Sequence, residues 1–167
     1  ALWSAVLARS GTTMENDPMS NPVVTGLGMA TLLAAGAQAL DNPLLNPWTG
    51  PYGGVPPFDQ VKVEMFQPAL EAAMAGQLAA IESIANDPAP PDFANTIAAL
   101  ERSGRTLDRV NAVFGIWGGN LSTPEFQAVE QTMAPKLAAF FDTIVQNEKL
   151  FARLAAVYGQ RETSGLT

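Results

Sequence analysis

The chain of 167 residues contains no cysteine and no histidine. Their absence excludes disulfides, zinc sites built on thiolate or imidazole, and nucleophiles activated by histidine. Carboxylates could still bind calcium or magnesium, but the sequence has no D-x-D-x-D-G loop. The sequence therefore predicts no catalytic residue, no metal ligand and no cofactor for this chain, and it identifies no substrate-binding residue.

Charged side chains are also scarce, at 15% of the chain, and 9 basic residues face 16 acidic ones. Proteins that bind nucleic acids neutralise phosphates with clustered Lys and Arg, so we expect no nucleic-acid partner. A low charge content suits a segment that covers much of its surface against another part of a protein. An alanine-rich helical core explains it equally well. The apolar content of 47% is typical of a folded chain.

Residues 1–40 are predicted to be an apolar N-terminal extension, because no charged residue lies between Asp17 and Asp41. The apolar run ends in Ala37-Gln38-Ala39, the small-x-small pattern of a signal-peptide cleavage site. If segment 20–39 is a signal peptide, the protein is periplasmic. The segment lacks the positively charged start of a signal peptide, but the cleavage pattern makes a signal the preferred interpretation, and the alternative is a packed helix in a cytoplasmic protein. The run is too short and too rich in Ala and Gly for a convincing membrane span.

Residues 41–60 are predicted to form an extended strap, because they hold five prolines and three glycines. The strap is expected to lie on an apolar surface through its large apolar residues, which are Leu44, Leu45, Trp48, Tyr52 and Phe58.

Residues 61–167 are predicted to be all-α, an antiparallel helical bundle or array preceded by the strap. Apolar residues recur every three or four positions from Lys62 to near Asn86, where a proline-rich segment ends the first helix. Asp92 is the expected N-cap of the next helix. Its apolar stripe keeps its phase across Gly104, which predicts one long helix or two nearly collinear ones. This stripe consists of Phe93, Ile97, Leu100, Leu107, Val110, Phe114, Trp117 and Leu121.

Two further helix starts follow in the sequence. The segment Ser122-Thr123-Pro124-Glu125 combines a capping hydroxyl, a proline and an acidic residue in the first turn. Pro135 is expected to kink or split that helix. Asn147 is the predicted cap of a last helix, whose apolar residues are Leu150, Phe151, Leu154 and Tyr158.

Two other patterns have structural explanations. Gly115 and Gly119 form a G-x-x-x-G spacing, which predicts close helix packing. Two pairs of carboxylates could be considered for acid–base catalysis, Glu64 with Glu71 and Glu125 with Glu130. We expect them instead to lie on solvated faces of helices.

Several blocks together resemble the N-terminal part of the peptidyl-dipeptidase and oligopeptidase A branch of the thimet oligopeptidase family. The most specific block is Phe93-Ala94-Asn95-Thr96-Ile97-Ala98-Ala99-Leu100-Glu101-Arg102-Ser103-Gly104. The others keep the order of the family and are Asn42-Pro43-Leu44-Leu45, Pro56 to Lys62, Phe66 to Met74, Ile81 to Asn86 and Ala134 to Ala139. The resemblance extends over about residues 42–166.

The resemblance implies an almost wholly helical enzyme that removes C-terminal dipeptides from short peptides. Family members hold one zinc through an H-E-x-x-H helix and a downstream glutamate, and the motif glutamate is the base. The matched helices form one wall of a substrate channel. No metal or catalytic residue carries over, because this sequence stops at Thr167, before the zinc motif. We therefore expect a truncated segment that is inactive alone.

The expected partners are the C-terminal catalytic region of the same enzyme and, in the full-length protein, short peptides. Uncovered apolar stripes also predict possible self-association of the fragment. Two alternatives remain from the sequence. One is a free-standing, non-catalytic helical interaction module, and the other is a membrane-associated protein anchored by residues 23–40.

Overall fold

The computed structural model describes residues 42–51 and 54–162. The predictions made on residues 1–40 and on Tyr52 lie outside the described residues. Within the described ranges the fold is all-α, as predicted, and a single bridge between Thr49 and Val55 is its only strand-like pairing.

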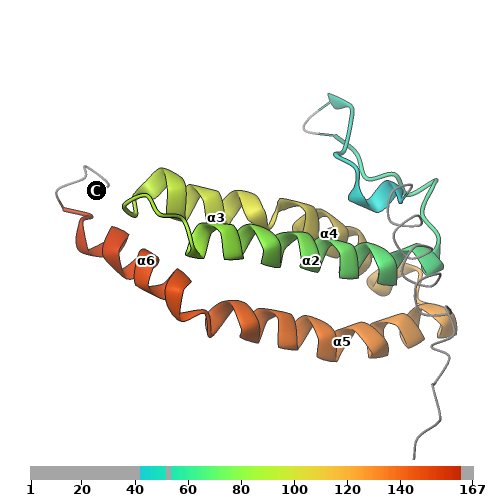
Figure 1. Ribbon diagram of the computed structural model, residues 1–167. Coiled ribbons are helices and arrows are strands. Elements are labelled where there is room, and N and C mark those ends of the chain that lie inside the picture. Colours follow the sequence, from blue (N-terminus) through green and yellow to red (C-terminus); the bar gives the residue numbers. More distant parts are fainter. Residues whose placement is uncertain (1–41, 52–53, 163–167) are drawn as a thin grey trace, which may run out of the picture.

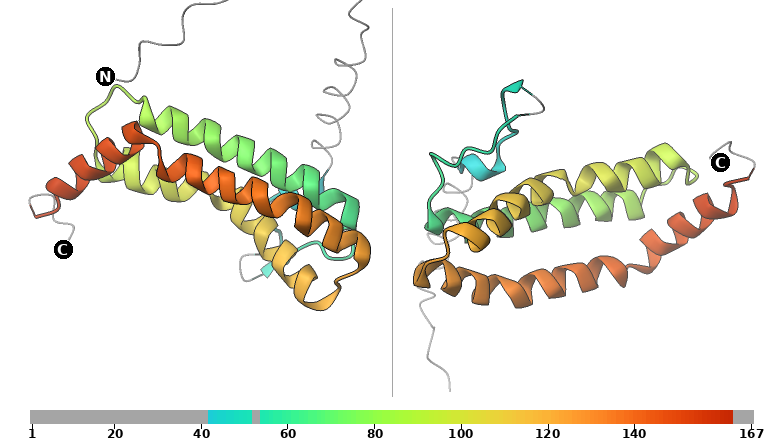
Figure 2. Two further views of the ribbon diagram at one scale, coloured as in Figure 1. Left: turned by 90° about the horizontal axis from the view of Figure 1, so that it is seen from below. Right: turned by 180° about the vertical axis from the view of Figure 1, so that it is seen from behind.

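The helices form two layers (Figure 1). The chain runs along α2 (Phe66–Ala85) and returns antiparallel to it along α3 (Ala98–Ser103) and α4 (Arg105–Asn120). It then runs out again along α5 (Pro124–Val145) and α6 (Glu148–Gly159), which form the second layer (Figure 2). Helix α2 touches α3, α4, α5 and α6 and is therefore the centre of the array.

Helix α2 confirms the first predicted helix. A 3₁₀ turn, Val63–Met65, leads into it, and Asn86 ends it by donating a side-chain hydrogen bond to the carbonyl of Glu82. Its apolar residues are buried on one stripe, namely Phe66, Ala69, Leu70, Ala73, Met74, Ile81, Ile84 and Ala85. Pro88, Pro90 and Pro91 follow, so the helix cannot continue.

The second predicted helix begins as expected but with a different phase. The Asp92 carboxylate accepts a hydrogen bond of 2.7 Å from the amide of Asn95, and the Asn95 side-chain oxygen accepts one of 2.9 Å from the amide of Asp92, which is a reciprocal capping box. The first turn, Phe93–Ile97, is a π-helix. Its wider turn rotates the start of the helix, so Thr96 is fully buried and Phe93 remains 47% exposed. The prediction that Phe93 faces the core is wrong.

The same stripe is corrected at its other end. Leu121 follows the last residue of α4 and is 53% exposed, whereas Val113, which the stripe did not include, is fully buried. Gly104 separates α3 from α4, so the alternative of two consecutive helices holds.

Helix α5 starts as predicted, with Thr123 accepting from the amide of Phe126 and Pro124 in the first turn. Pro135 does not split it, because α5 is continuous to Val145. A proline leaves the carbonyl four residues earlier, here that of Gln131, without its helical donor. Pro135 and Gln131 both occupy exposed positions, so water can hydrogen-bond that carbonyl.

Helix α6 is capped by Asn147, as predicted, but it presents another face to the core. Phe151 is 68% exposed and Tyr158 is 67% exposed, whereas Arg153 and Val157 are buried. The prediction that Phe151 and Tyr158 pack inward is therefore wrong. Hydrogen bonds from Arg153 to the segment after α2 set the rotation of α6, and sequence periodicity does not report such bonds.

The core is centred on the ring of Phe66, which is fully buried. Its centroid lies 5.4 Å from that of Phe114, 5.3 Å from Trp117 and 5.3 Å from Phe126, in tilted or edge-on contacts. A smaller cluster joins the ends of α2 and α6 and consists of Ile81, Ile84, Ala85 and Leu150.

The strap lies on this core, as expected. Leu44 is only 1% exposed in the main cluster, and Leu45 and Trp48 pack against it. Asn42 anchors the segment, because its side-chain amide donates to the carbonyl of Met65 at 2.8 Å. Phe58 is 38% exposed and contributes less than predicted.

The close helix packing expected at Gly115 and Gly119 occurs at a different glycine. A Cβ atom at either of these positions would meet nothing within 4 Å. At Gly118 it would lie 2.7 Å from the Glu130 carboxylate and 3.3 Å from the Phe126 ring. Gly118 is therefore the residue at which α5 approaches α4 closely.

Candidate functional site

No described residues are arranged as a metal site, since no group of three or more Asp or Glu in the described ranges could hold an ion. The four carboxylates singled out in the sequence lie on helix surfaces. Glu64 and Glu125 are exposed, and Glu71 and Glu130 are half-buried. Hydrogen bonds from its own backbone amide and from Thr123 lower the pKa of Glu125, as expected for an acid in the first turn of α5.

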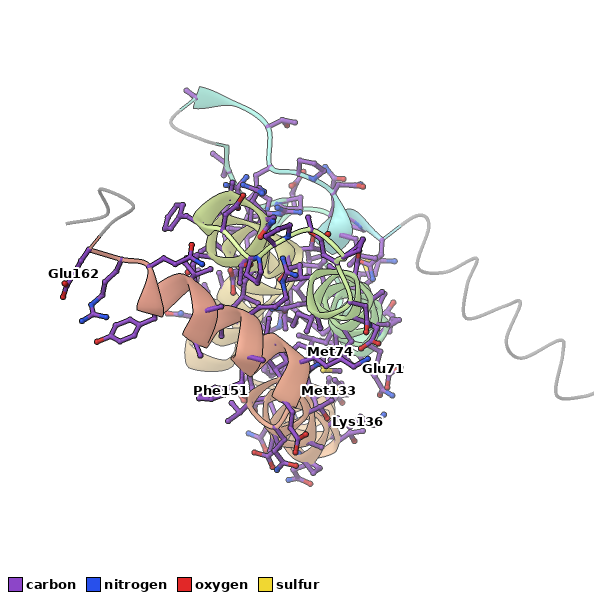
Figure 3. The ribbon with its side chains drawn as sticks, turned by 60° about the vertical axis from the view of Figure 1, so that its left-hand side comes forward. Glu71, Met74, Met133, Lys136, Phe151 and Glu162 are labelled. Carbon is purple, nitrogen blue, oxygen red and sulfur yellow. The ribbon has the colours of Figure 1, made fainter. Side chains whose placement is uncertain are left out.

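Glu71 joins the two layers of the fold. Its carboxylate accepts from Lys136 of α5 at 2.5 Å and from Gln67 at 3.1 Å (Figure 3). The hydrogen bond from Lys136 is the main cause that lowers the pKa of Glu71, and the Gln67 amide adds to it. Both charged side chains are more than 40% exposed, so water screens the pair.

Glu71→Gln is expected to lower the free energy of unfolding by less than about 1 kcal/mol near pH 7. A carboxyl whose pKa is lower in the folded state stabilises the fold above its unfolded pKa and loses this effect as pH falls through its folded pKa. The two proteins should therefore converge in urea unfolding as the pH is lowered from 7 towards 2. The Lys136→Met variant is the control, and Glu71→Gln should have no further effect in its background. A difference independent of pH would contradict the assignment.

A polar cluster surrounds the buried Arg153 side chain on α6. Its guanidinium donates to the carbonyls of Asp87 at 2.8 Å and Ala89 at 3.1 Å, and to the side-chain oxygen of Asn95 at 2.9 Å. The Asp87 carboxylate lies 3.7 Å away. Arg153 is only 7% exposed. One side chain therefore fastens α6 to the segment between α2 and α3.

A hollow of about 520 Å³ lies on the outer side of this segment and includes Asp87, Asn95 and Arg102 in its wall. Two of its polar side chains, Asn95 and Arg102, already have partners within the chain. Asn95 caps the π-helical turn and accepts from Arg153, and Arg102 donates to the carbonyl of Ala94 at 3.3 Å. The arrangement therefore holds helices in place, and it presents no nucleophile–base pair.

Sequence reasoning did not single out Arg153. A signal was present, since Leu150, Arg153 and Val157 recur at three- and four-residue steps and define the buried face of α6. The acceptors lie 58 to 66 residues earlier, and a single sequence does not pair them.

Among the helices of the described ranges, none combines the length and apolar character needed to cross a membrane.

The fold and its buried contacts describe an array of packed helices. The residues that the structure describes contain no catalytic cluster. Comparison with known proteins finds two similar peptidases. The chain is 40% identical over 125 residues to the dipeptidyl carboxypeptidase of Salmonella typhimurium, and equally to that of Escherichia coli. These alignments cover 75% of this chain and confirm the predicted resemblance to the peptidyl-dipeptidases. The chain spans only 18% of the length of either relative.

A weaker similarity, 31% identity over 130 residues, relates the chain to phosphoglycerate kinase of Maricaulis maris, of which it covers 29%. No family model matches the chain.

Proposed function

We propose that this chain is the N-terminal helical part of a zinc peptidase that removes C-terminal dipeptides from short peptides. In this role it forms a wall of the substrate channel and is inactive by itself. The observation that carries the proposal is the 40% identity over 125 residues to two dipeptidyl carboxypeptidases. The helical array supports it, because an all-α segment is what the resemblance implies for the N-terminal part of such an enzyme.

The residues of this chain do not fit the zinc that the family implies. The 167 residues contain neither histidine nor cysteine, and no described carboxylate cluster could replace them. Zinc ligands and the catalytic base therefore belong to the larger part of the enzyme, which is the proposed partner. The contribution of this chain is to position helices, as the contacts of Arg153 and the Phe66 ring cluster do.

A chimera tests the proposal. The matched stretch of the Escherichia coli enzyme is replaced by the corresponding residues of this chain, and dipeptide release from a short peptide is followed by mass spectrometry. We expect release by the chimera and none by the isolated chain, with or without added zinc.

The same enzyme carrying an unrelated helical segment of equal length is the control and should be inactive. Dipeptide release by the isolated chain that a chelator abolishes would overturn the proposed inactivity. A folded chimera without activity would overturn the proposed placement in the enzyme and leave the interaction module as the better function.

A further inference from the structure

Helix α5 has a second apolar face that no described element covers. Ala138, Phe141 and Val145 follow one another at three- and four-residue steps, so they share a side of the helix. Phe141 is 51% exposed and Val145 is 81% exposed. The inward face of α5 is a separate stripe that includes Met133 and Phe140. A helix that is apolar on two sides is typical of a position between two layers of a protein.

Helix α6 continues this face. Phe151, Ala155 and Tyr158 are spaced by four and three residues, and all are exposed. Phe151 projects away from Met74 and Met133, which lie between α2 and α5 (Figure 3). Val145 and Phe151 line one hollow of about 480 Å³ at the junction of the two helices. The six residues therefore form one surface across the junction, which we call the outer face.

The composition of the outer face is that of an interface. None of its six residues is charged, and three of them are aromatic. Charged groups border it, since the Arg161 guanidinium lies 4.1 Å over the Tyr158 ring and Glu148 lines the hollow. Aromatic side chains are enriched where one protein surface packs on another, and large apolar patches rarely stay exposed on monomers. The other large exposed apolar residues lie elsewhere, for example Val55 in the strap and Ile116 on α4.

We infer that the outer face packs against the remainder of the same peptidase chain. This inference rests on the proposed function. The matched stretch makes up 18% of each relative, so most of the enzyme lies beyond it. Segments of one chain meet at an effective concentration in the mM range, which favours this occupant over a second molecule. In the enzyme α5 then lies between α2 and the catalytic region.

The test compares two double variants in the chimera. Val145→Glu with Phe151→Glu places carboxylates in the outer face, and Ile116→Glu with Leu121→Glu is the matched control at exposed apolar positions of α4. Burying an unpaired carboxylate is strongly unfavourable, so we expect at least about a tenfold loss of soluble, active chimera for the first pair. The control pair should stay within about twofold of the unmodified chimera.

Both pairs should leave the helix content and thermal midpoint of the isolated chain nearly unchanged, because these residues are exposed in it. If the carboxylate pair prevents the chimera from folding, Val145→Ala with Phe151→Ala should still lower its thermal midpoint more than Ile116→Ala with Leu121→Ala. An active chimera that tolerates the outer-face pair as well as the control pair overturns the inference and leaves the proposed function intact. An unmodified chimera without activity overturns the proposed function itself.

Sedimentation equilibrium of the isolated chain tests the competing occupant. We expect the isolated chain to be monomeric or only weakly self-associated. The double variant Val145→Glu with Phe151→Glu should not change this oligomeric state. A stable dimer that this pair dissociates would assign the outer face to a second copy and overturn the inference.

Discussion

Replacing Phe66 by alanine is expected to lower the free energy of unfolding by about 4 kcal/mol. The ring is fully buried and touches three other rings, from α4 and α5. Truncation removes its buried apolar surface and leaves a cavity where α2, α4 and α5 meet. Edge-on contacts such as those with Trp117 and Phe126 add to the loss. Few single substitutions in this fold should cost more.

Urea unfolding followed by circular dichroism measures this change. Phe151→Ala is the matched control, because it removes the same ring from a position that is 68% exposed, and it should change stability by less than about 1 kcal/mol. Similar losses for the two variants would mean that Phe66 is not at the centre of the core.

Replacing Arg153 by methionine is expected to lower the free energy of unfolding by about 3 kcal/mol. This value is near the lower end of the losses that follow when one partner of a buried ion pair is removed. The Asp87 side chain is 31% exposed, which reduces the loss. The carbonyls of Asp87 and Ala89 lose the donor that Arg153 supplies, and the side-chain oxygen of Asn95 keeps its bonds from Asp92 and Thr96 but loses that from Arg153. Partly buried acceptors that lose a donor are unfavourable even where methionine fills the space.

Hydrogen exchange adds a readout that locates the effect. Amides of segment 87–95 and of α6 should exchange faster in Arg153→Met, while those in the first half of α2 change little. Arg153→Lys should be intermediate, because lysine keeps the charge but cannot make the forked contacts. Arg105→Met removes an exposed arginine of α4 and should be neutral within about 0.5 kcal/mol. Equal stability of Arg153→Met and the unmodified chain would contradict the conclusion that Arg153 fastens α6 to the segment between α2 and α3.

The exposed outer face gives the low charge content a structural meaning. Two explanations were open, an alanine-rich core or a segment that covers its surface against another part of the protein. The alanines of α5, which are Ala128, Ala134, Ala138 and Ala139, are all exposed rather than buried in the core, and Ala138 lies on the outer face. The outer face, if it packs as proposed, makes the second explanation the more complete one.

The helix starts could be predicted because their signals are local. Asp92, Thr123 and Asn147 each accept a hydrogen bond from an amide three residues later, and this interaction requires only a short stretch of chain. The all-α fold followed from the 3.6-residue periodicity for the same reason. The similarity to peptidases was also accessible, since blocks such as residues 93–104 occur in a fixed order.

Other features depend on contacts between distant segments, and only the tertiary structure decided them. The buried face of α6 depends on Arg153 reaching acceptors up to 66 residues earlier. The inward residue of the first turn after Asp92 is Thr96 rather than Phe93, because a π-helical turn changes the phase. Gly118, and not Gly115 or Gly119, meets a neighbouring helix.

The sequence by itself therefore determined the helices, their caps, the absence of histidine and cysteine, and the similarity to a peptidase. Each of these is a property of residues near one another in the chain or of their order. The tertiary structure decided which side of each helix is buried and where an apolar face remains uncovered. Periodicity shows that a helix has an apolar side, but the rotation of that helix is set by the packing and hydrogen bonds of the elements it meets.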